Sequence, residues 1–353
     1  MKKKLKLSQS PRKLLIIKPS SLGDVVHSMP FLNVIRESFP AAEIHWVIAK
    51  GLEGLLENHP MVQKLWVIDK NQWKKIKKLH VTVSELRTLF GALKSESYDL
   101  VIDLQGLLRS GLLTAATKAP FRLGFSEARE GSRIFYTHRI TGGRDIHAVD
   151  RYLKIASALG CDTGTVTFPL PLVKESPRIL QLKEEAGDYA VLAPGARWIT
   201  KRWPAERFGQ LCSRFSIKSI IIGSKADEAL AEEAAAHSDG KALSLAGKTD
   251  IKEMISIIRK ARFMVTNDSG PMHIAAACGV PVAALFGPTN PARTGPYGSG
   301  NVIIKTSIDC APCYKKKCSN IRCMDSISVE EVYEALKNKL GSNVIERKEL
   351  DES

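Results

Sequence analysis

One polar turn in this sequence is well suited to hold an anion. In the stretch Val265-Thr-Asn-Asp-Ser-Gly-Pro-Met-His-Ile, an apolar strand runs into Asp268, Ser269 and Gly270, and a helix of small residues follows. Asp268 and Ser269 can cap that helix, and Gly270 permits close approach of the backbone to a ligand or a positive φ. The N–H groups of the first helical turn then point at the ligand, and phosphate fits them best. The alternative is an ordinary strand-to-helix turn without a ligand.

A second turn of the same kind lies near the N-terminus. The apolar run Leu14–Ile17 leads into Pro19-Ser-Ser-Leu-Gly-Asp24, and a helix follows. Neither turn has the Gly-x-Gly-x-x-Gly or the Walker A pattern, which disfavours a dinucleotide-dependent dehydrogenase and a P-loop kinase. Two such units predict an α/β protein with two Rossmann-like, doubly wound lobes whose loops face a common cleft at the carboxyl ends of the strands.

Strand-like and helical stretches alternate along both halves of the chain, as parallel sheets require. In the first half the expected strands are 14–17, 43–48, 64–68 and 100–104. In the second half they are 189–192, 219–222, 242–245, 263–266, 282–286 and 302–304, with helices at 226–237 and 251–260.

Breaks in this alternation suggest the domain boundaries. The proline-rich stretch around residues 167–178 interrupts the periodicity and predicts a linker. We therefore expect an N-terminal lobe over 1–168, a linker over 169–178 and a C-terminal lobe over 179–327. A last helix over 328–340 is indicated by Ser328 with Glu331 at the capping-box position, and a polar tail follows over 341–353.

Composition limits the classes of function. The chain has 353 residues, 44% of them hydrophobic, and a formal net charge of +15, which favours an anionic partner without saying which one. No stretch is long and apolar enough for a signal peptide or a membrane span, so we expect a cytoplasmic protein. The seven cysteines agree with a reducing compartment. No nucleic-acid recognition module is evident, so we expect no nucleic-acid partner.

Five motifs in one order indicate a family. They are Ser20-Ser-Leu-Gly-Asp-Val-Val-His-Ser-Met-Pro30, Tyr98-Asp-Leu-Val-Ile-Asp-Leu-Gln-Gly-Leu-Leu-Arg-Ser110, His147-Ala-Val-Asp-Arg-Tyr152, Lys201-Arg-Trp-Pro204, and Asn267-Asp-Ser-Gly-Pro-Met-His273 with Phe286-Gly-Pro-Thr289. With them the chain resembles the ADP-heptose:lipopolysaccharide heptosyltransferases, glycosyltransferases of family 9, and within that family the heptosyltransferase I branch. The resemblance covers nearly the whole chain and implies the two-lobed GT-B fold.

The resemblance also implies roles for individual residues. Asp24 would be the catalytic base that takes a proton from the acceptor hydroxyl, although an aspartate here can also simply cap a helix. Lys201 would bind the donor and stabilise the leaving diphosphate together with the helix that begins near Asp268. The other residues expected to bind the donor are Ser20, Ser21, Gly23, Asp227, Glu228, Asp268, Ser269, Gly270 and His273. Of Asp227 and Glu228, either could be the family's ribose-binding acid.

For the acceptor, the resemblance implies a Kdo-lipid A, which is anionic and lies in a membrane. Arg129 and Arg151 match positions that bind it in the family. The lysines at 70, 74, 75, 77 and 78 around Trp73, with Trp66 nearby, would suit peripheral attachment to the cytoplasmic face of an anionic inner membrane. A charge run of this kind is also common on an ordinary solvated face.

Four cysteines near the C-terminus depart from this picture. Cys310, Cys313, Cys318 and Cys323 have spacings compatible in number with a four-thiolate zinc or iron–sulfur site. The alternative is a surface loop with reduced or disulfide-paired thiols. We expect the transfer itself to need no cofactor, because no Asp-x-Asp triplet for a divalent metal is present and Lys201 can take the metal's place.

The resemblance thus implies an inverting heptosyltransferase that uses ADP-heptose as donor. Two other functions remain open at this point. One is a nucleotide-sugar epimerase of the same fold, which needs no lipid acceptor. The other is a non-catalytic protein that binds nucleic acid or another anion, which only the net charge suggests.

Overall fold

The chain folds into two α/β units. The computed structural model describes residue 5 and residues 9–69, 79–173 and 175–341. The N-terminal unit comprises residues 1–171 and the C-terminal unit residues 172–353. Within the described ranges, no helix has both the length and the apolar character that crossing a membrane requires.

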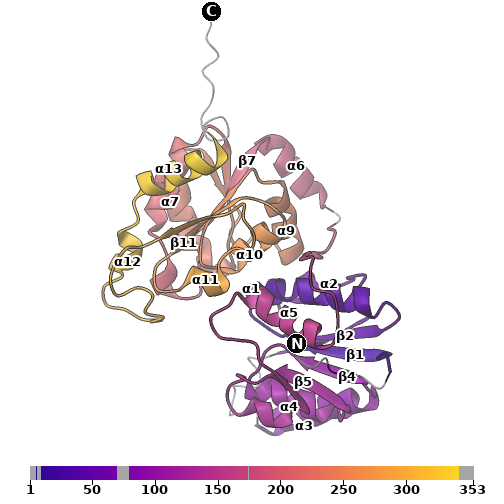
Figure 1. The fold of residues 1–353 in the computed structure, drawn as a ribbon. Coiled ribbons are helices and arrows are strands. Elements are labelled where there is room, and N and C mark those ends of the chain that lie inside the picture. Colours follow the sequence, from indigo (N-terminus) through magenta and orange to yellow (C-terminus); the bar gives the residue numbers. More distant parts are fainter. Residues whose placement is uncertain (1–4, 6–8, 70–78, 174, 342–353) are drawn as a thin grey trace, which may run out of the picture. The chain divides into compact units, whose positions relative to one another are not determined.

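The N-terminal unit is built on a six-stranded parallel sheet with the order β3-β2-β1-β4-β5-β6 (Figure 1). Strand β1 is nearly continuous apolar sequence because helices cover both faces of a parallel sheet. The strands are β1 (Lys13–Ile17), β2 (Glu43–Ala49), β3 (Lys64–Ile68), β4 (Leu100–Asp103), β5 (Phe121–Phe125) and β6 (His138–Ile140).

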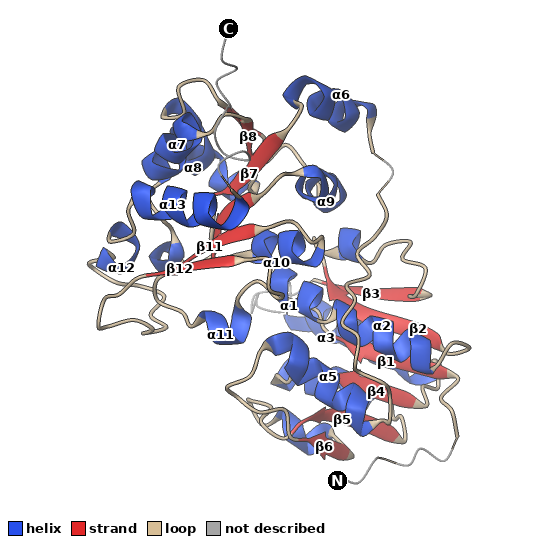
Figure 2. Ribbon diagram, turned by 45° about the horizontal axis from the view of Figure 1, so that its top comes forward, coloured by secondary structure: helices blue, strands red, loops and turns tan. Residues whose placement is uncertain are grey.

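Helices pack on the two faces of this sheet in two groups. Helices α1 (Leu22–His27), α2 (Met29–Ser38) and α5 (Ala148–Ala158) contact one another on one face. On the other face α3 (Leu79–Ser95) contacts α4 (Leu108–Ala116). Figure 2 shows the first group against the red strands of the sheet. The short helices are η1 (Glu53–Leu55) and η4 (Ser132–Phe135).

The first four strands form where the sequence predicts them, but the prediction missed β5 and β6. Strand β5 reads Phe-Arg-Leu-Gly-Phe, in which an arginine and a glycine interrupt the apolar pattern. Gly124 is required there because a Cβ would lie 2.3 Å from the Tyr136 ring. Strand β6 has three residues, too few for a periodic signal.

The C-terminal unit repeats the architecture with the order β12-β11-β10-β7-β8-β9, again all parallel. Its strands are β7 (Tyr189–Ala193), β8 (Lys218–Ile221), β9 (Ala242–Ser244), β10 (Met264–Asn267), β11 (Val282–Phe286) and β12 (Val302–Lys305). All six were predicted to within about one residue at each end, and the expected fold class of two doubly wound α/β units is confirmed.

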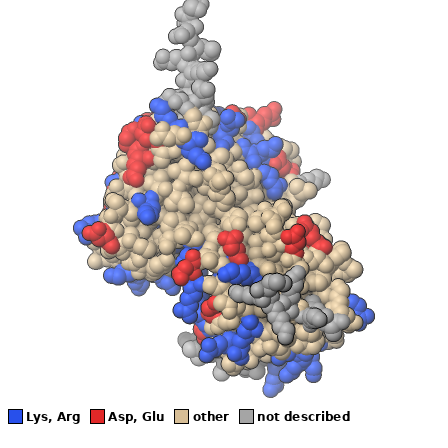
Figure 3. All heavy atoms as spheres, in the orientation of Figure 1, with Lys and Arg blue, Asp and Glu red and all other residues tan. Residues whose placement is uncertain are grey.

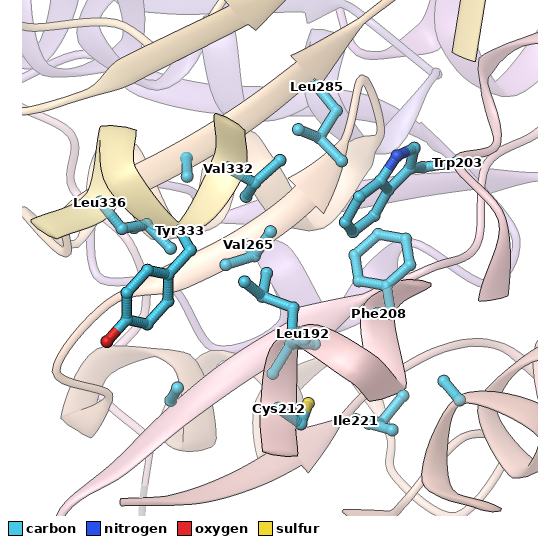
Figure 4. Packing of buried hydrophobic residues seen from close by; sticks show 14 of the residues in the cluster. Leu192, Trp203, Phe208, Cys212, Ile221, Val265, Leu285, Val332, Tyr333 and Leu336 are labelled. Carbon is cyan, nitrogen blue, oxygen red and sulfur yellow. The ribbon is translucent and has the colours of Figure 1, made fainter. Parts of the chain in front are cut away.

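A large apolar core lies on one face of this second sheet. Figure 4 shows Leu192, Val265 and Leu285 from the strands packed against the side chains of the covering helices. Trp203 closes one end of this core and donates its indole N–H to Ile327 O at 2.9 Å. The covering helices are α7 (Ala205–Arg214), α8 (Glu228–Ala236) and α13 (Val329–Leu340).

The opposite face carries α6 (Pro177–Ala186), α9 (Ile251–Lys260) and α10 (Gly270–Ala277). Helix α6 begins inside the range predicted as a linker. Helix α13 follows Ser328, whose hydroxyl accepts the Glu331 N–H at 3.0 Å. The remaining short elements are η5 (Ile199–Lys201), η6 (Lys225–Asp227), α11 (Pro291–Thr294) and α12 (Arg322–Asp325).

A charged cluster at the amino end of the first sheet should make that unit sensitive to acid. Glu96 accepts from Lys13 Nζ at 2.9 Å and pairs with Lys64. Burial opposes ionisation of this carboxyl group, but the bonds from Lys64 and Lys13 outweigh it and lower the pKa of Glu96 to about 2. The stabilisation is therefore complete above the ordinary carboxyl pKa of 4.5 and is lost as pH falls towards about 2.

We expect Glu96→Gln to lower the free energy of unfolding by about 1–2 kcal/mol at neutral pH. The difference from the parent protein should shrink as pH falls through the window from 4.5 to about 2. Denaturant unfolding at a series of pH values measures it, with the exposed Glu184→Gln as control. A difference that stays constant with pH would show that the Glu96 charge contributes nothing.

Candidate functional site

Both sequence-predicted turns lie at the topological switch point of their own sheet. In the N-terminal unit the strand order reverses between β1 and β4, and the turn with Asp24 follows β1. In the C-terminal unit the order reverses between β7 and β10, and the turn with Asp268 follows β10. Open α/β sheets bind ligands outside the carboxyl ends of the strands at this point. Topology therefore singles out the same two turns as the residue types do.

Asp24 is a capping residue as well as a candidate base. Ser21 is the N-cap of α1, and Asp24 is the third helical residue. Its Oδ2 accepts the Ser21 N–H at 2.8 Å and the Ser21 hydroxyl at 2.7 Å. The Asp24 side chain is 40% exposed. The carboxylate is thus held in one orientation while part of it stays accessible to a ligand.

Beneath Asp24 lies a buried lysine that the sequence reasoning did not single out. Lys18 is 3% exposed, and its Nζ lies 3.5 Å from Asp24 Oδ1 and 5.1 Å from the centre of the Tyr152 ring. Burial by itself lowers the pKa of Lys18, but Asp24, Tyr152 and Asp103 more than offset it and raise the pKa above its ordinary value. The ammonium is therefore charged and favours the ionised form of Asp24.

The loop after β4 is shaped by a second buried carboxyl group. Asp103 is fully buried, and its Oδ1 accepts the backbone N–H groups of Gln105 and Gly106 at 2.8 and 2.9 Å. Its Oδ2 accepts the Tyr136 hydroxyl at 2.6 Å. Asp103 therefore holds the loop between β4 and α4 in place. This loop follows β4, whereas the Asp24 turn follows the neighbouring strand β1.

In the C-terminal unit the two predicted donor residues form an ion pair. Lys201 Nζ lies 2.5 Å from Asp268 Oδ2, and the same oxygen accepts the Thr289 hydroxyl at 2.7 Å. Lys201 Nζ also lies 4.6 Å from the centre of the Trp198 ring. The Lys201 and Asp268 side chains are 16% and 6% exposed. Three loops, following β7, β10 and β11, are thus joined through one carboxylate.

The start of α10 differs from the expected capping. Ser269 is the N-cap, but its side chain makes no capping hydrogen bond. The Ser269 hydroxyl instead lies 3.1 Å from the Thr266 hydroxyl, and the Asp268 carboxylate is engaged with Lys201. Gly270 is the first helical residue, so the alternative of a positive φ is wrong. Gly270 and Met272 carry backbone N–H groups in the first turn, where an anion is favoured, whereas Pro271 has none. His273, on the same helix, is 7% exposed.

Asp227 and Glu228 have different surroundings. Asp227 Oδ2 accepts the Ser224 N–H and hydroxyl at 3.0 and 2.6 Å, and its Oδ1 lies 3.8 Å from Arg202 Nη2. The Glu228 carboxylate lies against Gly247, where a Cβ would come within 2.3 Å of Glu228 Oε1. The Asp227 carboxylate is therefore occupied by hydrogen bonds within its own loop. The Glu228 carboxylate lies against Gly247, which follows β9.

The two arginines expected to bind the acceptor flank one loop of the N-terminal unit. Arg129 is exposed in the segment after β5 and donates its backbone N–H to Gly106 O at 2.9 Å. Arg151 lies on α5 with its guanidinium 3.9 Å from the centre of the Phe125 ring and 3.9 Å from Glu127. Ser20 and Gly23 lie in the Asp24 turn of this unit, while the lysines at 70–78 and Trp73 lie outside the described residues.

The metal site that was one alternative for the cysteine segment has no support in the described residues. In the described part of the chain no group of three or more His, Cys, Asp or Glu side chains is placed to hold a metal ion. Cys318 is exposed, and its thiol donates to Asn320 O at 3.0 Å. Burial, and then the neighbouring Cys313 and Cys310, raise the pKa of Cys323.

The cysteine segment instead packs on the loops of the candidate donor site. Lys315 O accepts the Thr200 hydroxyl at 2.8 Å, next to Lys201. Pro288 O accepts the Tyr314 N–H at 2.8 Å, next to Thr289. The segment therefore supports the two loops that carry the partners of Asp268.

Comparison with known proteins agrees with this geometry. The model of glycosyltransferase family 9 (heptosyltransferase) matches residues 86–323. Lipopolysaccharide heptosyltransferase 1 of Pseudomonas aeruginosa is 35% identical over 327 residues, 87% of this chain and 87% of the relative. The crystal structure of a family 9 glycosyl transferase from Veillonella parvula has a TM-score of 0.79 at 27% identity, covering 93% of this chain and 97% of that one.

A further solved structure bears on the fold. Escherichia coli heptosyltransferase WaaC with ADP-2-deoxy-2-fluoro heptose has a TM-score of 0.74 at 23% identity, covering 92% of this chain and 99% of that one. Fold and site together define a glycosyltransferase of the GT-B class. The chain belongs to glycosyltransferase family 9, the heptosyltransferases, and is a transferase.

Proposed function

We propose that this protein transfers heptose from ADP-heptose to the Kdo-lipid A inner core of lipopolysaccharide, with inversion at the anomeric carbon. The observation that carries the proposal is the Lys201–Asp268–Thr289 cluster beside the uncapped start of α10, at the switch point of the C-terminal sheet. It offers an ammonium group and helix N–H donors to a diphosphate. Family membership supports heptose as the transferred sugar.

The chemical step divides between the two units. Asp24 accepts the proton of the acceptor hydroxyl as its oxygen attacks the anomeric carbon of the heptose. The bond from that carbon to the β-phosphate oxygen breaks, and ADP leaves with the added negative charge. Lys201 and the first turn of α10 stabilise that charge. The step needs no resident cation, because these groups supply the positive charge where it is required.

The names of the relatives support both substrates. The Pseudomonas aeruginosa relative is named for lipopolysaccharide, and the Escherichia coli structure is described as holding an ADP-heptose analogue. Arg129 and Arg151 are the proposed partners of the anionic groups of the acceptor, since guanidinium groups pair with carboxylates and phosphates. An acceptor of this kind places the protein at the cytoplasmic face of the inner membrane as a peripheral protein.

One incubation experiment tests the proposal against the other functions. The protein is given ADP-heptose with and without Kdo-lipid A, and products are identified by mass and by the stereochemistry of the heptose. Transfer requires both substrates and releases ADP. An altered nucleotide sugar without acceptor would indicate an epimerase instead, and no turnover in either case would indicate a binding protein.

The different surroundings of the two acids give a second prediction. We expect Glu228→Gln to raise the KM for ADP-heptose by about tenfold with little change in melting temperature, because Glu228 is proposed to accept from the ribose hydroxyls. Asp227→Asn should instead lower the melting temperature, because Asp227 holds Ser224 and Arg202. Donor kinetics and thermal unfolding of both variants measure this. The reverse pattern would assign the ribose to Asp227.

A further inference from the structure

An exposed apolar surface lies on the N-terminal unit outside the site described above. Leu108 and Leu112 on α4 are 43% and 40% exposed, and Ile134 on η4 is 69% exposed. Leu108 and Leu112 are four residues apart, so they lie on the same face of the helix. Aliphatic side chains exposed together on adjacent elements favour an interaction surface over chance exposure of a single residue.

The two helices form one surface because they pack directly on each other. A Cβ at Gly111 of α4 would lie 2.6 Å from the Phe135 ring and 3.0 Å from Ser132 Cβ, both on η4. Glu130, just before η4, accepts the backbone N–H of Leu108 at 3.1 Å. The position of Ile134 relative to α4 is therefore fixed by backbone packing.

Positively charged residues flank these apolar residues, together with the exposed Glu130. Arg109 and Arg133 are exposed on the same two helices, and Lys118 is exposed just beyond the end of α4. In Figure 3, Lys and Arg side chains are frequent at the end of the N-terminal unit where Figure 1 labels α3 and α4. Aliphatic groups flanked by arginines are typical of surfaces that insert into the headgroup region of anionic membranes.

We propose that the surface formed by Leu108, Leu112 and Ile134 with Arg109 and Arg133 docks on an anionic lipid membrane. The aliphatic groups enter the boundary between headgroups and acyl chains, and the arginines pair with lipid phosphates. This inference rests on the proposed function for its purpose, because a lipid-linked acceptor must be reached from the membrane surface.

The place of this surface in the fold agrees with that purpose. Helix α4 begins at the carboxyl end of β4, which neighbours β1, and the Asp24 turn follows β1 at the same edge of the sheet. Arg129, proposed to bind the acceptor, is bonded to the loop that leads into α4. Docking by α4 and η4 would therefore bring the membrane surface close to the proposed acceptor-binding residues of the N-terminal unit.

Vesicle binding tests the proposal. The full-length protein is mixed with sedimentable vesicles of phosphatidylethanolamine and phosphatidylglycerol, and the bound fraction is compared with that on neutral phosphatidylcholine vesicles. We expect the double variant Leu112→Ser/Ile134→Ser to lower the partition coefficient on anionic vesicles at least about tenfold. Arg109→Ser/Arg133→Ser should lower it similarly and remove much of its dependence on salt. The control is Leu180→Ser, an exposed leucine of α6 that is 52% exposed.

Activity separates docking from the transfer reaction. The Leu112→Ser/Ile134→Ser variant should keep parental kcat/KM with a deacylated, water-soluble acceptor and lose activity with acceptor embedded in vesicles. If both double variants bind vesicles as well as the parent protein does, the docking proposal is wrong. The same result is expected if this face binds a protein partner and not a membrane. If the unmutated protein binds vesicles but transfers no heptose to either acceptor, the proposed function is wrong and the docking proposal stands.

Discussion

Asp24→Asn is expected to lower kcat by about a thousandfold while changing the affinity for ADP-heptose no more than a few-fold. The carboxylate is proposed to take the acceptor proton, and general-base catalysis contributes on the order of 10²–10⁴ in rate. The amide has nearly the same shape and can still accept from Ser21, but it cannot take the proton. Steady-state kinetics with both substrates, together with donor binding measured by calorimetry, gives the two quantities separately.

Two controls separate catalysis from capping. Asp250 is the N-cap of α9 and accepts the Glu253 N–H at 2.8 Å, so Asp250→Asn reports what the loss of a capping charge does elsewhere in the chain. That variant should retain parental kcat. Melting temperatures should also be compared, because Asp24→Asn removes the carboxylate that lies 3.5 Å from the buried Lys18 ammonium. A folded Asp24→Asn variant with near-parental turnover would remove Asp24 from the mechanism.

Lys201→Met is expected to weaken ADP binding by about ten- to a hundredfold and to lower kcat/KM by a further order of magnitude. The ammonium is proposed to pair with phosphate charge in the ground state and more strongly as ADP departs, so binding and rate should both fall. Calorimetric titration with ADP and donor-dependent kinetics measure the two effects.

The matched control for Lys201 is Lys218→Met, which removes an exposed lysine of the same unit. Lys201→Met also removes the ammonium partner of Asp268, whose carboxylate still accepts the Thr289 hydroxyl, so the melting temperature must be followed in parallel. Unchanged ADP affinity in a folded Lys201→Met variant would place the diphosphate elsewhere.

The sequence predicted those elements whose signal is local. Strand β11 has the predicted bounds because it is a short apolar run. Helix α9 has the predicted bounds because its apolar residues recur at helical spacing after an aspartate cap. Strand β5 was missed because its arginine and glycine break the pattern, although Arg122 satisfies its guanidinium with backbone oxygens of Ala119 and Phe135.

The contacts within the site could not be predicted because they join residues distant in the chain. Lys201 and Asp268 are 67 positions apart, and the strand order that brings their loops together has no local signature. Lys18 was overlooked for a different reason. A lysine beside a strand is ordinarily solvated, and only the folded unit shows that this one is buried against Asp24 and Tyr152.

The ion pair between Lys201 and Asp268 means that the proposed donor site already holds a counter-ion before any nucleotide arrives. An incoming diphosphate competes with a carboxylate for the same ammonium, so part of the Coulomb attraction is offset by the contact that is given up. In the proposed mechanism Asp268 pairs with the ammonium again when ADP departs, while the Thr289 hydroxyl holds the carboxylate in place. We expect this exchange of anionic partners to limit product inhibition by ADP.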